Sequence, residues 1–264
     1  MTTFRATGSG DAKVLILPGL FGGGGGFDTM LSYADLDRYQ YVEMGYRGFG
    51  TSKREPGLFT FREVVTDAVR LLDYLGWTKT HLLGHSVGAL AAQMIAVAVP
   101  TRVASIVSLA GTTARGTSRN TERLRAMSEA ASDAAVRNTI INTGTGKRYT
   151  RGFVDGIARL SDGNISPIAF GKYAEDAMVT DIQSQVKGSP MPYLAVVGKH
   201  DPVNTEALTI ETTLRLYKNA TLQVIDTGHF PMIECPALTM SLVEQFQNGV
   251  VNPSRALETP LPIN

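Results

Sequence analysis

A serine between two glycines is the feature of this sequence that most clearly suggests chemistry. The run Gly84-His85-Ser86-Val87-Gly88 has the pattern G-x-S-x-G, with strand-like residues 80–83 before it and small, helix-forming residues 89–96 after it. A serine in this context lies on a sharp turn from strand to helix, where its hydroxyl is exposed at the edge of the sheet. We therefore predict that Ser86 is a nucleophile. The alternative is a serine that only caps the following helix.

A serine hydroxyl is a weak nucleophile at neutral pH and needs a base beside it, most often a histidine. The sequence has four histidines. His81 lies within the predicted strand, and His85 adjoins the serine and should point away from it. His200 and His229 each follow a later apolar run. Because sites in parallel sheets form at the carboxyl ends of strands, these two are the candidate bases.

An acidic residue must hold the second ring nitrogen of the base and stabilise the imidazolium ion. Asp201 follows the apolar run 193–197, which would place it at the carboxyl end of a strand, although Asp-Pro also favours a simple turn. Asp226 is the weaker candidate because it lies three residues before His229, in the same loop. The predicted catalytic residues are therefore Ser86, Asp201 and His229, in this order along the chain.

A carbonyl oxygen that becomes negatively charged during attack needs fixed hydrogen-bond donors. We expect one donor to be the backbone N–H of Val87, directly after the serine. The second should come from the loop after the first strong strand, and the N–H of Leu20 is the candidate. The glycine run 22–26 in this loop lacks the lysine and the serine or threonine of a phosphate-binding loop. We expect it to leave room for a substrate, and we expect no cofactor and no metal.

The elements that position these residues alternate between strand and helix. Short apolar runs that end in a turn are typical of strands buried on both faces of a parallel sheet. A helix is predicted from the capping-box pair Thr60 and Glu63 to the stop at Gly76, and another follows Ser86. This alternation predicts an α/β fold with a mostly parallel sheet. The predicted strands lie at residues 13–17, 41–44, 81–83, 103–109, 193–197 and 222–225.

One stretch interrupts the alternation, because residues 112–186 contain no convincing strand and are predicted to form helices and loops. We expect residues 1–111 and 187–251 to form the core domain. Residues 112–186 would then be an inserted helical cap, or lid, over the open end of the sheet. The tail 252–264 contains three prolines and is expected to be extended or disordered.

Composition and charge narrow the class of protein. The 264 residues, of which 43% are hydrophobic and 19% charged, are typical of one large globular domain. A net charge of +1 gives no electrostatic reason to expect a nucleic acid or a membrane as partner. A single cysteine and the absence of a signal peptide or spanning segment lead us to expect a cytoplasmic location. The sequence does not indicate an oligomeric state.

Several motifs resemble those of α/β-hydrolase-fold proteins of the capped esterase, lactonase and haloperoxidase-like type, over about residues 10–250. The resemblance implies a mostly parallel sheet of eight strands flanked by helices, with an inserted helical cap, and supports the same triad and oxyanion donors. One departure is Pro18-Gly19, where relatives usually carry His-Gly; the backbone donor survives this change. The motifs are LPGLFG at 17–22, GYRGFGTS at 45–52, GHSVG at 84–88, GKHDPV at 198–203 and GHF at 228–230.

These residues predict a cofactor-independent serine hydrolase that cleaves a small-molecule carboxylic ester or lactone through an acyl-enzyme intermediate. The same triad would also serve a C–C bond hydrolase or an acyltransferase, and a hydrolase-fold ligand receptor with slow turnover is a third alternative. A serine at position 86 in place of an aspartate disfavours dehalogenase and epoxide-hydrolase chemistry. The candidates for lining the substrate pocket are Phe21, Met127, Phe170, Tyr173 and Phe230.

Overall fold

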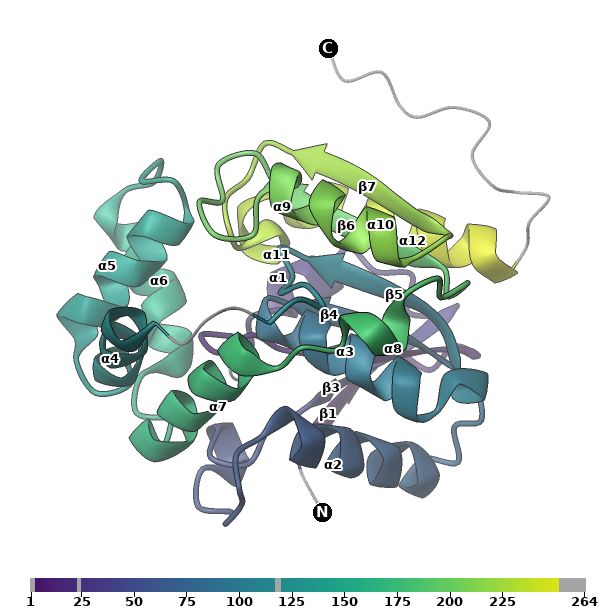
Figure 1. Ribbon diagram of the computed structural model, residues 1–264, viewed down its shortest axis with the longest axis horizontal. Helices are drawn as coiled ribbons and strands as arrows, with labels where there is room; N and C mark the ends of the chain where they lie inside the picture. Colours follow the sequence, from purple (N-terminus) through teal and green to yellow (C-terminus); the bar gives the residue numbers. More distant parts are fainter. Residues whose placement is uncertain (1–2, 23–24, 117–119, 252–264) are drawn as a thin grey trace.

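The computed structural model describes residues 3–22, 25–116 and 120–251, so the predicted tail 252–264 lies outside the described residues. A central sheet lies between two layers of helices, with a further group of helices at one side (Figure 1). The strand order is β1-β3-β2-β4-β5-β6-β7, and only the pair β1–β3 is antiparallel among the described strands. The strands are β1 Phe4–Thr7, β2 Ala12–Leu17, β3 Tyr39–Met44, β4 Thr80–His85, β5 Val103–Leu109, β6 Tyr193–Gly198 and β7 Ala220–Ile225.

The predicted α/β architecture with a mostly parallel sheet is confirmed, with one difference in the number of strands. The described residues form seven strands, whereas the family resemblance implied eight. β1 is the edge strand beside β3, and no described segment pairs with its outer side. The inner strands are apolar and buried, as a sheet covered on both faces requires.

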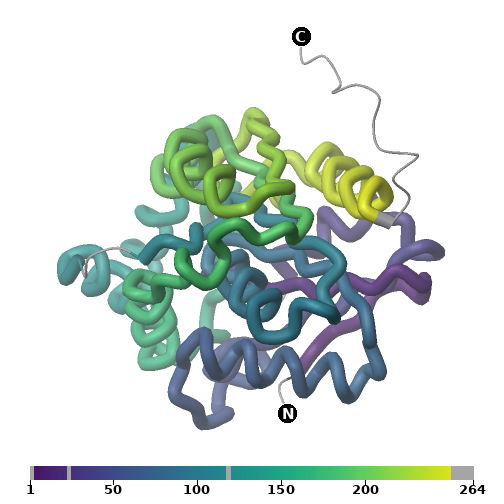
Figure 2. Tube along the Cα trace, turned by 45° about the vertical axis from the view of Figure 1, so that its right-hand side comes forward, coloured from purple at the N-terminus to yellow at the C-terminus, as the bar shows by residue number. Residues whose placement is uncertain are grey.

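The two faces of the sheet are covered by different helices, as Figures 1 and 2 show. α2 and α3 pack on each other and α8 packs on α3, while α1 and α12 pack together on the opposite face. α9 and α10 lie beside β6 and β7, and the short α11 precedes α12. The bounds of these helices are α1 Asp28–Leu31, α2 Phe61–Tyr74, α3 Val87–Ala98, α8 Gln183–Val186, α9 Glu206–Glu211, α10 Thr213–Leu216, α11 Pro231–Glu234 and α12 Pro236–Val251.

The predicted start and stop of α2 match the structure. The side chain of Thr60 accepts a hydrogen bond from the N–H of Glu63 at 3.3 Å. The carboxylate of Glu63 accepts the N–H of Phe59 at 3.0 Å, so it reaches one residue further back than a capping box requires. The chain leaves the helix through Gly76, whose φ of 65° is in the left-handed region that favours glycine.

Four consecutive helices lie together beside the sheet, at the left of Figure 1. α4 packs against α5 and α7, and α5 packs against α6. Among the described residues of 112–186 there is no named strand; Ile165 forms an isolated bridge with Phe49. The assignment of this segment to an inserted cap stays a prediction. The helices are α4 Thr121–Ala130, α5 Ala134–Gly144, α6 Arg151–Ser161 and α7 Pro167–Val179.

The loop of residues 45–52 holds the start of α7 against the core. Gly48 has a φ of 83°, and a Cβ atom at this glycine would lie 2.2 Å from the Cβ of Ala169 on α7. The N–H of Ser166 donates to the carbonyl of Gly48 at 2.8 Å. A side chain at position 48 would therefore push the helix away from the loop.

Two residues predicted to line the substrate pocket lie instead in the aromatic core between this loop and α7. Phe170 and Tyr173 are both 0% exposed. The ring of Phe170 lies 5.2 Å from that of Phe21, and the ring of Tyr173 lies 5.7 Å from those of Phe49 and Phe61. Both side chains are surrounded by other rings, which is why neither reaches the cavity beside Ser86.

We expect Phe170→Ala to lower the free energy of unfolding by about 3–5 kcal/mol, because it removes a fully buried ring and leaves a cavity. Urea denaturation measures the change. Ile168→Ala on the same helix is the matched control, since Ile168 is 67% exposed and its loss should change stability by about 0.5 kcal/mol or less. Equal effects of the two substitutions would contradict this placement of Phe170.

Candidate active site

Ser86 lies on a strained turn between β4 and α3. Its φ of 52° and ψ of −122° are rare for a residue with a side chain. A Cβ atom at Gly88 would lie 2.0 Å from the carbonyl oxygen of Leu17, and one at Gly84 would lie 2.5 Å from that of Gly88. The N–H of Ser86 donates to the carbonyl of Leu109 on the neighbouring strand at 3.0 Å. The turn therefore has the geometry that the G-x-S-x-G pattern predicts.

The side chains of Ser86, His229 and Asp201 form a row of hydrogen bonds. His229 Nε2 lies 3.0 Å from Ser86 Oγ, and His229 Nδ1 lies 2.7 Å from Asp201 Oδ2. A ring protonated at Nδ1 donates to the carboxylate and can accept the serine hydroxyl at Nε2. The structure thus brings together three residues from three separate loops, and they are the three that the sequence selected.

Asp201 is held ionised although its side chain is completely buried. Oδ1 accepts the backbone N–H groups of Val203 at 2.8 Å and Asn204 at 3.2 Å. Burial by itself raises the pKa of this carboxyl, but the His229 ring and these N–H donors outweigh it, so the pKa lies below its ordinary value. The carboxylate can therefore orient the ring and stabilise a positive charge on it.

The other candidate base and the other candidate acid bind each other. His200 Nε2 lies 2.7 Å from Asp226 Oδ1, at a partly exposed position where Arg148 also contacts Asp226. His81 is buried within β4, and its Nδ1 lies 2.8 Å from Ser105 Oγ. Among the described residues, neither His81 nor His200 forms a hydrogen bond with Ser86, which leaves His229 as the histidine partner of the serine.

His85 has a role that sequence reasoning missed. The sequence suggested that its ring points away from the serine, yet the ring lies 5.1 Å from that of His229 and lines the same cavity as Ser86. Its Nε2–H donates to the carbonyl of His229 at 2.7 Å. Burial lowers the pKa of His85 to about 3, so the ring is neutral at physiological pH. A neutral ring beside His229 adds no repulsion when His229 becomes charged.

Glu234 is the second group that the sequence did not reveal. Its buried carboxylate accepts the N–H of Gly228 at 2.7 Å and that of Phe230 at 3.0 Å, the residues on either side of His229. The N–H of His229 itself donates to the carbonyl of Gly144, at the end of α5, at 2.9 Å. Three successive N–H groups are thus bound, and they fix the backbone that carries the ring. No sequence motif marks position 234, because Glu234 contacts the backbone.

The two backbone donors expected for an oxyanion lie beside Ser86. A Cβ atom at Gly19 would lie 2.6 Å from His85 Nδ1 and 3.0 Å from Ser86 Cβ, so this loop is packed directly on the serine turn. Leu20 and Val87 both line the cavity. Within the described part of the chain, neither N–H has a hydrogen-bond acceptor. Their role as an oxyanion hole stays a prediction.

Ser86 and His229 open into a cavity of about 370 Å³. Phe21, Met127 and Phe230 line it, as the sequence suggested, whereas Phe170 and Tyr173 do not. Most of its wall is apolar and comes from α4, α5, α7 and the loops at the carboxyl ends of the strands. The volume is that of a small-molecule site.

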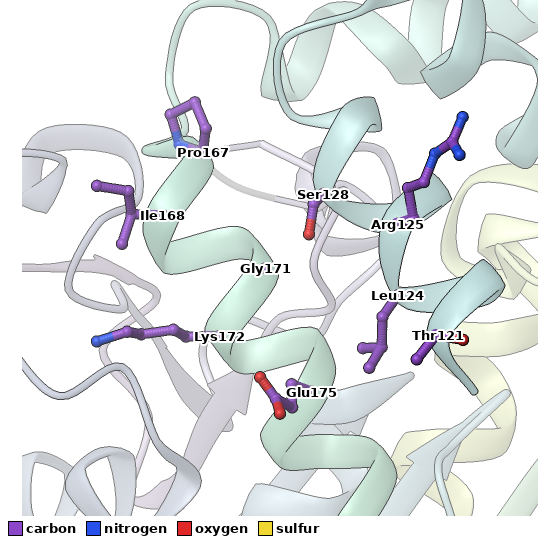
Figure 3. Close-up of a pocket in the computed structure, with 9 residues that line it drawn as sticks. All are labelled: Thr121, Leu124, Arg125, Ser128, Pro167, Ile168, Gly171, Lys172 and Glu175. Carbon is purple, nitrogen blue, oxygen red and sulfur yellow. The ribbon is translucent and has the colours of Figure 1, made fainter. Parts of the chain in front are cut away.

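A second, more open hollow lies between α4 and α7, and Figure 3 shows its side chains. The two helices approach closely there, because a Cβ atom at Gly171 would lie 2.8 Å from Ser128 Oγ. None of the predicted catalytic residues lines this groove. We therefore place the candidate active site in the cavity beside Ser86.

Comparison with known proteins identifies the class. A family model described as the alpha/beta hydrolase fold matches residues 13–236, and the chain belongs to this family. Among solved structures, the enol-lactonase from Burkholderia xenovorans LB400 has a TM-score of 0.81 at 20% identity, covering 93% of this chain and 95% of that one. An esterase from Exiguobacterium antarcticum has a TM-score of 0.82 at 16% identity, covering 94% and 95%. At these sequence identities, the similarity to the two structures shows a shared fold and nothing more.

Curated relatives are similar over different lengths. One relative is RutD of Caulobacter vibrioides, which is provisionally named a carbamate hydrolase. It is 36% identical over 100 residues, which is 38% of this chain and 37% of the relative. The match thus spans little more than a third of that relative. 3-Oxoadipate enol-lactonase 2 of Acinetobacter baylyi is 25% identical over a match that covers 79% of this chain and 78% of the lactonase. Within the described residues, no helix has the length and apolar character to cross a membrane.

The lowered pKa of Asp201 predicts how stability depends on pH. Because the folded-state pKa lies below the ordinary value of 3.8, the ionised carboxylate stabilises the fold above that pH, and the contribution is lost as the pH falls through the folded-state pKa. We expect the stability advantage of the wild type over Asp201→Asn to shrink as the pH falls below about 5 toward the folded-state pKa of Asp201, which lies under 3.8. Urea unfolding of both proteins measures it, and a constant advantage would contradict the assignment.

Proposed function

We propose that this protein is a serine hydrolase that cleaves a small carboxylic ester or lactone, with Ser86 as nucleophile. The observation that carries the proposal is the hydrogen-bonded row of Ser86, His229 and Asp201 at the wall of a mostly apolar cavity. The names of the Acinetobacter lactonase and of the structural neighbours support this class of reaction.

The first half of the reaction forms an acyl-enzyme. Ser86 Oγ attacks the carbonyl carbon of the substrate while His229 Nε2 takes the hydroxyl proton. The charge that develops on the carbonyl oxygen is stabilised by the N–H groups of Leu20 and Val87. The carbonyl re-forms, the bond to the leaving oxygen breaks, and His229 returns its proton to that oxygen. Asp201 stabilises the imidazolium ion between these two proton transfers.

The second half repeats the same steps with water. His229 Nε2 removes a proton from a water molecule, which attacks the acyl carbon, and the same backbone donors hold the oxygen. His229 then protonates Ser86 Oγ as the acid departs. Throughout both halves, the carbonyl of His229 accepts a hydrogen bond from His85, and the N–H groups of the two neighbouring residues are bound by Glu234. The backbone of His229 therefore stays in place while its ring exchanges protons.

A carbamate is a second candidate substrate, on the strength of the Caulobacter relative. The attack on a carbamate carbonyl needs the same nucleophile, base and oxyanion donors. The leaving group would be an alcohol if the C–O bond of a carbamate ester breaks, or an amine or ammonia if the C–N bond breaks, and His229 would protonate either.

Ser86→Ala should lower kcat for a p-nitrophenyl ester by about 10⁴-fold or more, because it removes the nucleophile. A fluorophosphonate probe should label the peptide that contains Ser86 in the wild type and leave the variant unlabelled. His200→Gln is the matched control, since His200 pairs with Asp226 outside the row, and it should retain most of the activity. Undiminished turnover by Ser86→Ala, or labelling at another residue, would refute the proposal.

Glu234→Gln tests whether the buried carboxylate positions His229. A glutamine at this site offers one oxygen for two N–H groups, so we expect kcat to fall about ten- to a hundredfold with little change in KM. A purely structural role would lower stability without this division between kcat and KM. Asp226→Asn is the matched control, because Asp226 is exposed although it lies in the loop that carries His229. It should leave kcat and KM near their wild-type values. An unchanged kcat in Glu234→Gln would contradict the positioning role.

A further inference from the structure

Two arginines and no acidic residue lie in the described wall of the cavity beside Ser86. Arg115 and Arg123 line it, and among the described lining residues there is no aspartate or glutamate. Asp201 is not part of the lining and is bound to His229 and two backbone N–H groups. An uncharged ester would therefore offer neither arginine an ion-pair partner within the cavity.

The two arginines come from different elements. Arg115 lies in the loop after β5, and Arg123 lies in the first turn of α4. Neither forms an ion pair within the described residues. The carboxylate of Asp181 is the acidic group whose charge interacts with Arg115, but Asp181 accepts hydrogen bonds from Gln183. Both guanidinium groups can therefore bind a ligand.

Arg125 lies on the same helix as Arg123 but, unlike Arg123, forms an ion pair within the described residues. Its Nε lies 2.9 Å from Glu129 Oε1, and its side chain points away from α7, as Figure 3 shows. Arg125 lines the groove between α4 and α7 and is absent from the wall of the cavity beside Ser86. The ion pair that Arg125 forms with Glu129 thus has no counterpart, within the described part of the chain, at position 123, where the side chain lines the cavity.

We propose that the substrate of this site carries a carboxylate on its acyl part, bound by Arg115 and Arg123, and this inference rests on the proposed hydrolase function. The planar guanidinium group matches a carboxylate and can bind both of its oxygens. The same cavity wall is mostly apolar, with Ala126, Met127 and Ala177 among its residues. The substrate class is therefore a monoester or lactone of a dicarboxylic acid, with an apolar chain between its two carbonyl carbons.

Pairs of p-nitrophenyl esters test the proposal. Mono-p-nitrophenyl succinate, glutarate and adipate are compared with the butanoate, pentanoate and hexanoate, so that each pair differs only in a terminal carboxylate or methyl group. For at least one chain length, we expect wild-type kcat/KM to be about tenfold or more higher for the acidic ester. The preference should weaken as salt is added, because both arginines are exposed and their charges are screened.

The double variant Arg115→Gln, Arg123→Gln should lose nearly all of the preference for the acidic ester. The preference is measured as the ratio of kcat/KM for the acidic ester to kcat/KM for the neutral ester. Arg125→Gln is the matched control and should keep the wild-type ratio, because Arg125 borders the other groove. Since both substituted arginines are exposed, circular dichroism should show unchanged folding of the double variant. A ratio in the double variant equal to the wild-type ratio would overturn the proposal.

The experiment separates this inference from the function on which it rests. If the wild type hydrolyses acidic and neutral esters equally at all three chain lengths, the carboxylate site is overturned and the hydrolase function stands. If neither kind of ester is hydrolysed and a fluorophosphonate fails to label Ser86, the hydrolase function itself is overturned, and the inference with it.

Discussion

The strained backbone of Ser86 is the constraint on which the rest of the site depends. A non-glycine residue in this conformation costs about 1–3 kcal/mol and persists only where its surroundings hold it. Here the carbonyl of Leu109 on β5 accepts the N–H of Ser86. The carbonyl of Ser86 in turn accepts the N–H of Thr112 at 2.9 Å. Gly84 and Gly88 allow strand, turn and helix to approach within distances that side chains would forbid. The result is a hydroxyl that lines the cavity and lies within hydrogen-bond distance of His229.

The histidine loop meets that hydroxyl because segments far apart in the chain hold it. His85 from β4 binds the carbonyl of His229, Gly144 from α5 binds its N–H, and Glu234 from α11 binds the N–H groups on either side. Asp201 then fixes the ring itself. Hydrogen bonds to backbone and ring together leave the imidazole little freedom except to exchange protons. Because α5 contributes one of these bonds, the helices beside the sheet also support the histidine.

Much of the site was predictable because parallel strands bring their carboxyl ends to one edge of the sheet. Ser86, Asp201 and His229 each follow such a strand, and their meeting in space follows from that topology. His85 and Glu234 escaped prediction because they act on backbone groups, which leave no pattern of residue types in the sequence. Phe170 and Tyr173 were misplaced for a related reason. Their spacing on a helix indicates burial, but it does not tell whether a ring faces a cavity or other rings.

The sequence by itself determined the strands β2 to β7, their order and the residue types at their ends, because local propensity, capping and turn chemistry act between near neighbours, but it did not indicate the edge strand β1. Only the tertiary structure decided which buried aromatic residues form the core and how the His229 loop is held. It also decided that Arg115 and Arg123 share a cavity with Ser86. These are contacts between segments widely separated in the chain, and they depend on how helices pack beside the sheet, which no local periodicity records.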